Sequence, residues 1–422
     1  MAILKQSGDI SFSPSSSSQD VSADDFFSNE LTSGYPWINK WMLRSGAYEY
    51  IRLLFFPVGF PASVSSNYFC YVKYSFMQVA LNTSSRVLAT QAMLMAVGVG
   101  QSLPMAAAIS WALKDGFGQI GSIVVSAIIN KDFDSDPKRY RYQAVTLGQA
   151  ANFFSILSLA YPPLFLLFSA TGGALSRVGT VAHISSRARI YGEFSKSLGD
   201  LMRCSQAQST LAALIGTGIG VALSPLGLGS VNTVLAAFVP LAIATQYLAY
   251  KSSQIVVLHT LNVQRAEILF KHLVDSLEKH DSFNGVLDSK QLQILTPEEV
   301  AHVEVFTSTY RSHFKRPLLV NPQIRPEVAD HTDFLKTWNF FIHDDQQSVL
   351  LWFSEDATPH QVLMGFFLSC IHREFAHSSE LGNSSFITIE NVWKVVLDDM
   401  SKKGWNIETV FIDSHGSRLK FE

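Results

Sequence analysis

The sequence predicts a mainly α-helical protein, in which a multi-span helical membrane module is followed by a smaller α+β polar domain. Two observations predict this fold class: long stretches without charged side chains, and a change in charge partway along the chain. Residues 1–250 carry a net charge of +4 and residues 251–422 one of −7, and eleven of the twelve histidines lie in the second region. Two regions in contact with different solvents would show this division.

The first region contains four stretches that lack Asp, Glu, Lys and Arg altogether, at residues 87–113, 116–130, 142–176 and 204–250. A bilayer core about 30 Å thick needs about 20 apolar helical residues to cross it. We therefore expect four spans, near residues 87–113, 153–175, 210–226 and 231–250. The 15-residue stretch is too short to span alone. A large soluble helical core is the alternative, but its outer helices would need a charged face.

Prolines and small residues should shape these spans. Prolines interrupt a helix, and small residues allow two helices to pack closely. Pro162 and Pro163 should kink the second span, because proline removes a helical hydrogen bond. Ala212, Gly216 and Gly220 are spaced by four residues, which predicts a small-residue face for close helix packing. The glutamines in or beside the spans, Gln101, Gln206 and Gln208, leave open a helix-lined pathway as the alternative reading.

Ionic residues at the ends of the spans are the candidate functional residues. Lys114 and Asp115 form a pair at the end of the first span, where charge is costly and often functional, or where it marks the end of a helix. Asp134 and Asp136 lie in a mixed-charge segment at residues 130–142. That segment could bind an anion or a metal ion, or act as a solvated connector.

A second charged connecting segment is expected at residues 177–203, which include Arg187. Both connecting segments are net basic, but they flank a single span, so the positive-inside rule leaves the orientation open.

Composition and motifs exclude several other classes. The net charge of −3 and the lack of a basic stripe argue against a nucleic-acid binder. Three widely spaced cysteines predict free thiols without a disulfide framework.

Residues 116–121 match G-x-G-x-x-G but follow an apolar span and not a strand, so we do not expect a nucleotide site. His372 and His377 are five residues apart, which does not suit a zinc helix. The sequence thus predicts no metal site, and no cofactor or catalytic residue can be assigned.

The remaining segments complete the domain organisation. Residues 1–50 are expected to be a disordered or variable N-terminal segment without a clear transit peptide. Residues 51–262 form the expected membrane module, and residues 263–422 the α+β domain. In that domain we expect helices at residues 263–280, 359–375 and 389–402, a helix that starts with a capping box at Thr296, a strand pair at 338–342 and 349–353, and a final hairpin at 409–412 and 418–421.

Short motifs in a characteristic order resemble those of the root UVB-sensitive (RUS) family of plants. These motifs are FPVGFP at residues 56–61, ATQA at 89–92, WALKDG at 111–116, FDSDPK at 133–138, TLNVQR at 260–265 and GW at 404–405. The resemblance covers about residues 50–420, and it rests on the order and spacing of the motifs together.

The resemblance implies a role in plant development, UV-B response, auxin transport and vitamin B6 homeostasis. It also implies hetero- or homo-oligomers with other RUS-family members, and it suggests the plastid as the organelle, which the N-terminus does not support with a clear transit peptide. Contact with membrane lipid and location in a membrane are expected from the uncharged stretches. No reaction is associated with the family, so an enzyme is less expected than a non-enzymatic scaffold or complex subunit. The alternatives are a transporter or carrier of a small metabolite and an enzyme acting near vitamin B6 metabolism.

Overall fold

The structure is a computed structural model. It describes a few residues between 112 and 123 and, continuously, residues 47–100, 132–227, 230–279, 294–307, 310–312, 314–322, 338–345, 347–374, 383–413 and 418–419. The chain divides into two compact units, Met1–Val64 and Ser65–Glu422. Each unit is described separately.

The described part of the first unit is a helix followed by a turn. Helix α3 (Ala47–Phe55) leads into the FPVGFP motif. Arg52 Nη2 donates a hydrogen bond to the Phe60 carbonyl oxygen at 3.1 Å, which closes the turn back onto the helix. Gly59 has a φ of 76°, a conformation that glycine adopts without steric cost. The glycine of this motif is therefore required by the turn.

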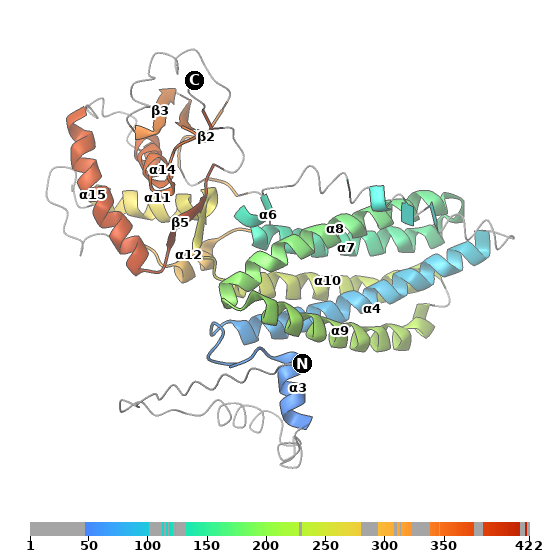
Figure 1. Ribbon diagram of the computed structural model, residues 1–422. Helices are drawn as coiled ribbons and strands as arrows, with labels where there is room; N and C mark the ends of the chain where they lie inside the picture. Colours follow the sequence, from blue (N-terminus) through green and yellow to red (C-terminus); the bar gives the residue numbers. More distant parts are fainter. Residues whose placement is uncertain are drawn as a thin grey trace, which may run out of the picture. The chain divides into compact units, whose positions relative to one another are not determined.

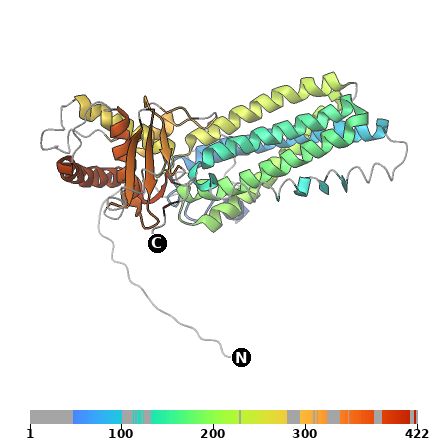
Figure 2. The same ribbon diagram turned by 90° about the horizontal axis from the view of Figure 1, so that it is seen from above.

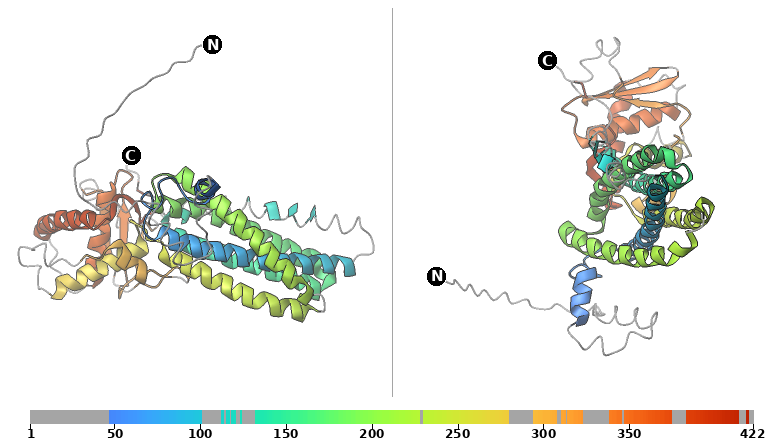
Figure 3. Two further views of the ribbon diagram at one scale, coloured as in Figure 1. Left: turned by 90° about the horizontal axis from the view of Figure 1, so that it is seen from below. Right: turned by 90° about the vertical axis from the view of Figure 1, so that its right-hand side faces the viewer.

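The second unit begins with a bundle of five long helices in the described residues (Figures 1 and 2). They are α4 (Tyr68–Gly100), α7 (Pro137–Ala160), α8 (Phe165–Phe194), α9 (Leu198–Leu223) and α10 (Val231–Ile255). Helix α4 contacts α7, α9 and α10, and Figure 3 shows it between its neighbours when the bundle is viewed along its length. The short helix α6 (Asp132–Ser135) precedes α7, and the 3-10 turn η2 (Ser224–Gly227) precedes α10.

The small residues of α9 lie against α4. Ala212 is fully buried, and a Cβ added to Gly216 would lie 2.1 Å from the Ala80 carbonyl oxygen. Ser84 Oγ donates to the Gly216 carbonyl oxygen at 2.8 Å, so the two backbones are in close contact here. One turn further along, a Cβ on Gly220 would lie 2.7 Å from Val87 Cβ.

The expectation of one kinked span at residues 153–175 is wrong. Tyr161 ends α7, and Pro162 begins the 3-10 turn η1 (Pro162–Leu164) that leads into α8. Helices α7 and α8 then pack against each other. Proline disfavours helical geometry at the residue before it, and Tyr161 has a non-helical φ of −131° and ψ of 72°. The two prolines therefore separate two helices instead of bending one.

The two charged segments expected to be connectors are largely helical. Helix α8 continues through most of residues 177–203 and ends at Phe194. Residues 132–135 form α6, and Pro137 is the first residue of α7. The expected span at 87–113 falls partly within α4, which already begins at Tyr68, and residues 101–111 lie outside the described residues.

Two segments in the described part of the chain are long and apolar enough to cross a membrane, Pro162–Phe194 and Val231–Ile255. The second matches the span expected at residues 231–250. The other two expected spans do not meet the same criterion within the described residues. The structure therefore confirms a mainly helical protein with a small sheet region and shows two candidate spans instead of four.

The remainder of the second unit is an α+β region. Its helices are α11 (Val263–Lys279), α12 (Pro297–Val303), α14 (Pro359–Glu374) and α15 (Asn383–Lys402), and its strands are β1 (Thr260–Asn262), β2 (Leu318–Val320), β3 (Phe340–Asp345), β4 (Ser348–Phe353) and β5 (Asn406–Phe411). The sheet order is β2-β4-β3, with β4 parallel to β2 and antiparallel to β3. This confirms the expected β3–β4 hairpin. The capping box of α12 at Thr296 is confirmed as well.

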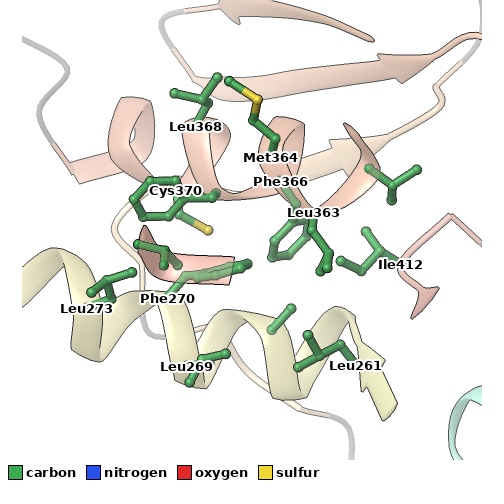
Figure 4. Close-up of a cluster of buried hydrophobic side chains, with 14 of the residues drawn as sticks. Leu261, Leu269, Phe270, Leu273, Leu363, Met364, Phe366, Leu368, Cys370 and Ile412 are labelled. Atoms are coloured by element: carbon green, nitrogen blue, oxygen red, sulfur yellow. The ribbon is translucent and has the colours of Figure 1, made fainter. Parts of the chain in front are cut away.

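The hydrophobic core of this region lies between α11 and α14 (Figure 4). Phe270 of α11 lies 5.3 Å from Phe367 of α14, measured between ring centroids, and both side chains are buried. The final hairpin expected at residues 409–412 and 418–421 is wrong. Strand β5 pairs in parallel with β1, and Leu419 forms a bridge with Ser354. Ile407 and Val410 of β5 pack, partly buried, against the core, and residues 414–417 and 420–422 lie outside the described residues.

Candidate functional site

Two adjoining cavities that open to solvent lie between helices of the bundle, with volumes of about 430 and 370 Å³. Helices α4, α7, α8 and α9 line the first, and α4, α7 and α8 line the second together with Asp115. The two cavities share four lining residues: Arg86, Asn152, Ser176 and Thr180. They therefore form one continuous space along the bundle, lined by both polar and apolar side chains, which we call the bundle cavity.

Each helix contributes polar side chains at helical spacing. On α4 these are Gln78, Asn82, Arg86 and Thr90, and on α8 they are Ser176, Thr180, His183 and Arg187. Residues three or four apart lie on one face of a helix, so each set forms a continuous polar stripe. Arg187 and Arg177 are ten residues apart on α8, which corresponds to about 15 Å along the helix axis.

A buried arginine, Arg141, contacts the bundle cavity through His183, one of the residues that line it. Arg141 of α7 is 1% exposed. Its guanidinium donates from Nη2 to Ser75 Oγ at 2.9 Å, and its carbon Cζ lies 5.4 Å from the centroid of the Tyr71 ring. Arg141 Nη1 lies 3.1 Å from His183 Nδ1. Since arginine can only donate, Nδ1 must accept, so the proton of the neutral imidazole is on Nε2.

A second arginine lines the cavity directly. Arg187 of α8 donates to Ser205 Oγ of α9, and its guanidinium lies 5.5 Å from the centroid of the Tyr191 ring. The hydroxyls of Tyr191 and Ser205 are 2.6 Å apart. Neither Arg141 nor Arg187 forms an ion pair with a carboxylate within the described residues. Buried or half-buried guanidinium groups without a carboxylate favour an anion nearby.

Two buried amides in the cavity have no partner in the described part of the chain. Gln78 is 3% exposed and Asn152 is 8% exposed, and the side chain of neither forms a hydrogen bond there. An unsatisfied buried polar group costs about 1–3 kcal/mol. The cavity is therefore suited to a polar occupant that can satisfy these amides.

The structure places the candidate residues from the sequence at different sites. Asp115 is exposed and lines the second cavity together with Arg86 and Arg177, whereas Lys114 lies outside the described residues. Asp134 is exposed on α6. Asp136 lies at the N-terminus of α7, with its Oδ2 atom 3.0 Å from Arg139 Nε. Burial raises the pKa of Asp136, and Arg139 offsets only part of this shift.

The DSDPK segment does not act as a solvated connector, because its lysine is buried in an ionic triad. Lys138 Nζ lies 2.6 Å from Glu304 Oε2, and Arg265 Nη1 lies 2.7 Å from Glu304 Oε1. All three side chains are at most 1% exposed. Burial alone would raise the pKa of Glu304, but Lys138 and Arg265 outweigh it and hold the pKa below its ordinary value.

Two motifs that are far apart in the sequence meet around this triad. Asn262 Nδ2 and Arg265 Nη2 both donate to the Ser135 carbonyl oxygen, at 2.9 and 3.0 Å. Ser135 belongs to the FDSDPK motif and the other two to the TLNVQR motif. These motifs therefore connect the helical bundle to the α+β region and do not form the bundle cavity.

Most of the bundle cavity was not predicted from the sequence. Arg187 was assigned to a connecting segment and Arg141 to the mixed-charge segment at residues 130–142, whereas Gln78 and His183 were not singled out. The signal that could have found them is the spacing of Ser176, Thr180, His183 and Arg187 by four, three and four residues. Of the three glutamines considered for a pathway, Gln206 lines the cavity and Gln101 lies outside the described residues.

The fold and the cavity define a class of protein: a helical bundle with a cavity between its helices, joined to an α+β region by a buried ionic triad. A family model described as "Vitamin B6 photo-protection and homoeostasis domain" matches residues 42–276, more than half of the chain. The chain belongs to the root UVB-sensitive (RUS) family.

Curated relatives support this assignment over different lengths. Protein root UVB sensitive 2, chloroplastic, from Arabidopsis thaliana is 31% identical over 86% of this chain and 83% of its own length. Protein root UVB sensitive 3 is 24% identical over 87% of both chains. Protein root UVB sensitive 5 is 32% identical over 54% of this chain, but the match spans only 48% of that relative. No solved structure matches the chain significantly.

Proposed function

We propose that this protein is a membrane-inserted carrier that binds a small polar metabolite in the bundle cavity. The observation that carries the proposal is the bundle cavity itself, a space between helices that presents polar and cationic side chains, in a bundle whose outer faces are apolar. Polar cavities between membrane helices are the usual sites of substrate binding in carriers. The sequence favoured a scaffold and kept a carrier as its alternative; the bundle cavity favours the carrier.

The outer surface of the bundle supports membrane insertion. Large apolar side chains are more than half exposed on four of its helices: Leu94 on α4, Leu167 and Ile184 on α8, Leu214 and Val221 on α9, and Ile243 and Tyr247 on α10. The most apolar windows of the two candidate spans are only 22% buried within the protein. A soluble core helix would bury most of such a window. Helix α10 is about 37 Å long by its residue count, enough for a bilayer core of about 30 Å.

The family description suggests which metabolite to test first. It refers to vitamin B6, whose vitamers are small polar ring compounds. A cavity of about 430 Å³ is large enough for a ligand of this kind. The relatives' names refer to UV-B sensitivity of the root, and we propose that such a response follows from a changed distribution of the metabolite.

Uptake by the full-length protein reconstituted in liposomes tests this proposal. Labelled pyridoxine and pyridoxine 5′-phosphate serve as probes, with empty liposomes as the background. Thr180 lines both parts of the cavity, and its hydroxyl bonds only to Ser176 of its own helix. Thr180→Trp should therefore fill the cavity and lower uptake at least tenfold. Thr217→Trp is the matched control, because Thr217 is exposed on α9 and has the same kind of bond.

Two outcomes would overturn the proposal. One is uptake of both probes at the level of empty liposomes. The other is equal uptake by the wild-type protein and Thr180→Trp. Carbonate extraction tests insertion separately, since an inserted protein stays in the membrane fraction.

The scaffold role and the association with other RUS-family members stay predictions of the sequence, as does an enzyme acting near vitamin B6. Co-purification from native membranes distinguishes a complex subunit from an independent carrier. A plastid location also stays a prediction; one relative carries "chloroplastic" in its name.

A further inference from the structure

The ionic residues that line the bundle cavity leave it with a positive charge. Among the residues that the structure describes, they are Arg86, Arg177, Arg187 and Asp115, which give a net formal charge of +2. None of the three arginines forms an ion pair with a carboxylate in the described part of the chain. Arg141 is a further buried cation, and its guanidinium contacts the His183 ring.

Hydrogen-bond donors converge at the Arg187 end of the cavity. His183 accepts from Arg141 at Nδ1, so Nε2 carries a proton, and that proton has no partner among the described residues. Gln78 lies in the same lining and forms no side-chain hydrogen bond there; its buried Oε1 atom can only accept, so its Nε2 atom is the donor that it brings to the cluster. Arg187 uses one Nη atom for Ser205 and keeps its other donors. We call Arg187, His183 and Gln78 the donor cluster.

Such a cluster suits a compact oxyanion. A phosphate monoester carries a charge of about −1.5 to −2 near neutral pH, opposite in sign to Arg187 and to the buried Arg141 next to His183, and its three oxygens accept several hydrogen bonds. Guanidinium donors and a neutral imidazole N–H are ordinary phosphate partners.

We propose that the donor cluster binds the phosphate group of the solute, so that the carrier takes phosphorylated small metabolites in preference to their uncharged forms. This inference rests on the proposed carrier function and specifies its substrate class. Arg141 acts as a positioning residue, because its bond to Nδ1 turns the donating side of His183 toward a ligand.

Isothermal titration of the purified full-length protein in detergent tests the donor cluster. The probes are inorganic phosphate, pyridoxine 5′-phosphate and pyridoxine, of which the last two differ only in the phosphate group. We expect inorganic phosphate to compete with pyridoxine 5′-phosphate, and pyridoxine to bind at least tenfold more weakly. Dioctanoyl phosphatidic acid is a further probe, because a lipid headgroup offers the same phosphate chemistry.

Two variants address the cluster and two serve as matched controls. Arg187→Gln removes the charge and should weaken phosphate binding about 10- to 100-fold. Gln78→Glu is isosteric and breaks no hydrogen bond in the described residues, and its negative charge should weaken phosphate binding at least as much. Arg203→Gln and Gln143→Glu change exposed residues outside the cavity and should leave binding unchanged.

The results of the titration and of the uptake assay distinguish failure of the phosphate site from failure of the carrier proposal. Equal binding of pyridoxine and its phosphate, with no effect of Arg187→Gln or Gln78→Glu, would overturn the phosphate site and leave the carrier intact. Absence of phosphate binding to the wild-type protein would also overturn it, while the uptake assay still decides the carrier. Tighter binding of dioctanoyl phosphatidic acid than of inorganic phosphate would support the site and assign its occupant to a lipid headgroup.

Discussion

Lys138 Nζ and Glu304 Oε2 lie 2.6 Å apart in the interior of the protein, although 166 residues separate them in the sequence. Arg265 shares the same carboxylate, so two cations and one anion are buried together. Breaking a buried ion pair by removing one partner is strongly destabilising, because the other charge stays buried without compensation. This triad is therefore a contact between the bundle and the α+β region that should be sensitive to the loss of one partner.

Glu304→Gln should destabilise the protein by about 3–5 kcal/mol, because Lys138 and Arg265 would lose their carboxylate. Thermal unfolding in detergent measures the effect. Glu298→Gln is the control, since Glu298 is exposed on the same helix. A loss no larger than that of the control would contradict the assignment of the triad.

The stabilisation from Glu304 should depend on pH in a defined direction. Its pKa is held below the ordinary 4.5, so the ionised carboxylate is favoured in the folded state. The contribution is thus complete above pH 4.5 and is lost as the pH falls through the lowered pKa. The stability difference between wild type and Glu304→Gln should stay constant from neutral pH to about pH 5 and shrink below it. A difference that grows on acidification would refute this sign.

Gly216→Ala should weaken the packing of α9 against α4. The added Cβ would lie 2.1 Å from a carbonyl oxygen of Ala80, which cannot move aside as a side chain could. Overpacking of this kind costs about 1–3 kcal/mol. Gly218→Ala is the matched control, because a Cβ there meets nothing within 4 Å, and it should be neutral or stabilising by up to about 1 kcal/mol. Melting temperatures in detergent compare the two, and equal values would count against close packing at Gly216.

His259 should titrate above the ordinary histidine value. Its Nδ1 lies 2.8 Å from Glu193 Oε2, and this hydrogen bond raises the pKa of His259 above 6.5. The stabilisation is therefore fully present below pH 6.5 and is lost as the pH rises through the raised pKa. NMR titration of the His259 ring measures the pKa directly. Glu193→Gln should lower it, and an unchanged value would show that Glu193 is not the cause.

The sequence predicted structural features correctly where these features depend only on neighbouring residues. The capping box at Thr296 and the hairpin of β3 and β4 are examples, because both are satisfied within a few residues. The same reasoning failed for the expected final hairpin, since β5 finds its partner in β1, about 150 residues earlier. The prediction at Pro162 was also wrong, because the local sequence looks the same whether a proline kinks a helix or ends it.

The sequence by itself determined that the protein is mainly helical, that its composition changes near residue 250, and that its motifs follow the order of the RUS family. These properties depend on residue type and local order. Only the tertiary structure decided which polar residues meet. Gln78, His183 and Arg187 line one cavity because α4 and α8 enclose it together. Lys138, Arg265 and Glu304 come together only after the chain folds, because charges this far apart in the sequence have no local reason to pair.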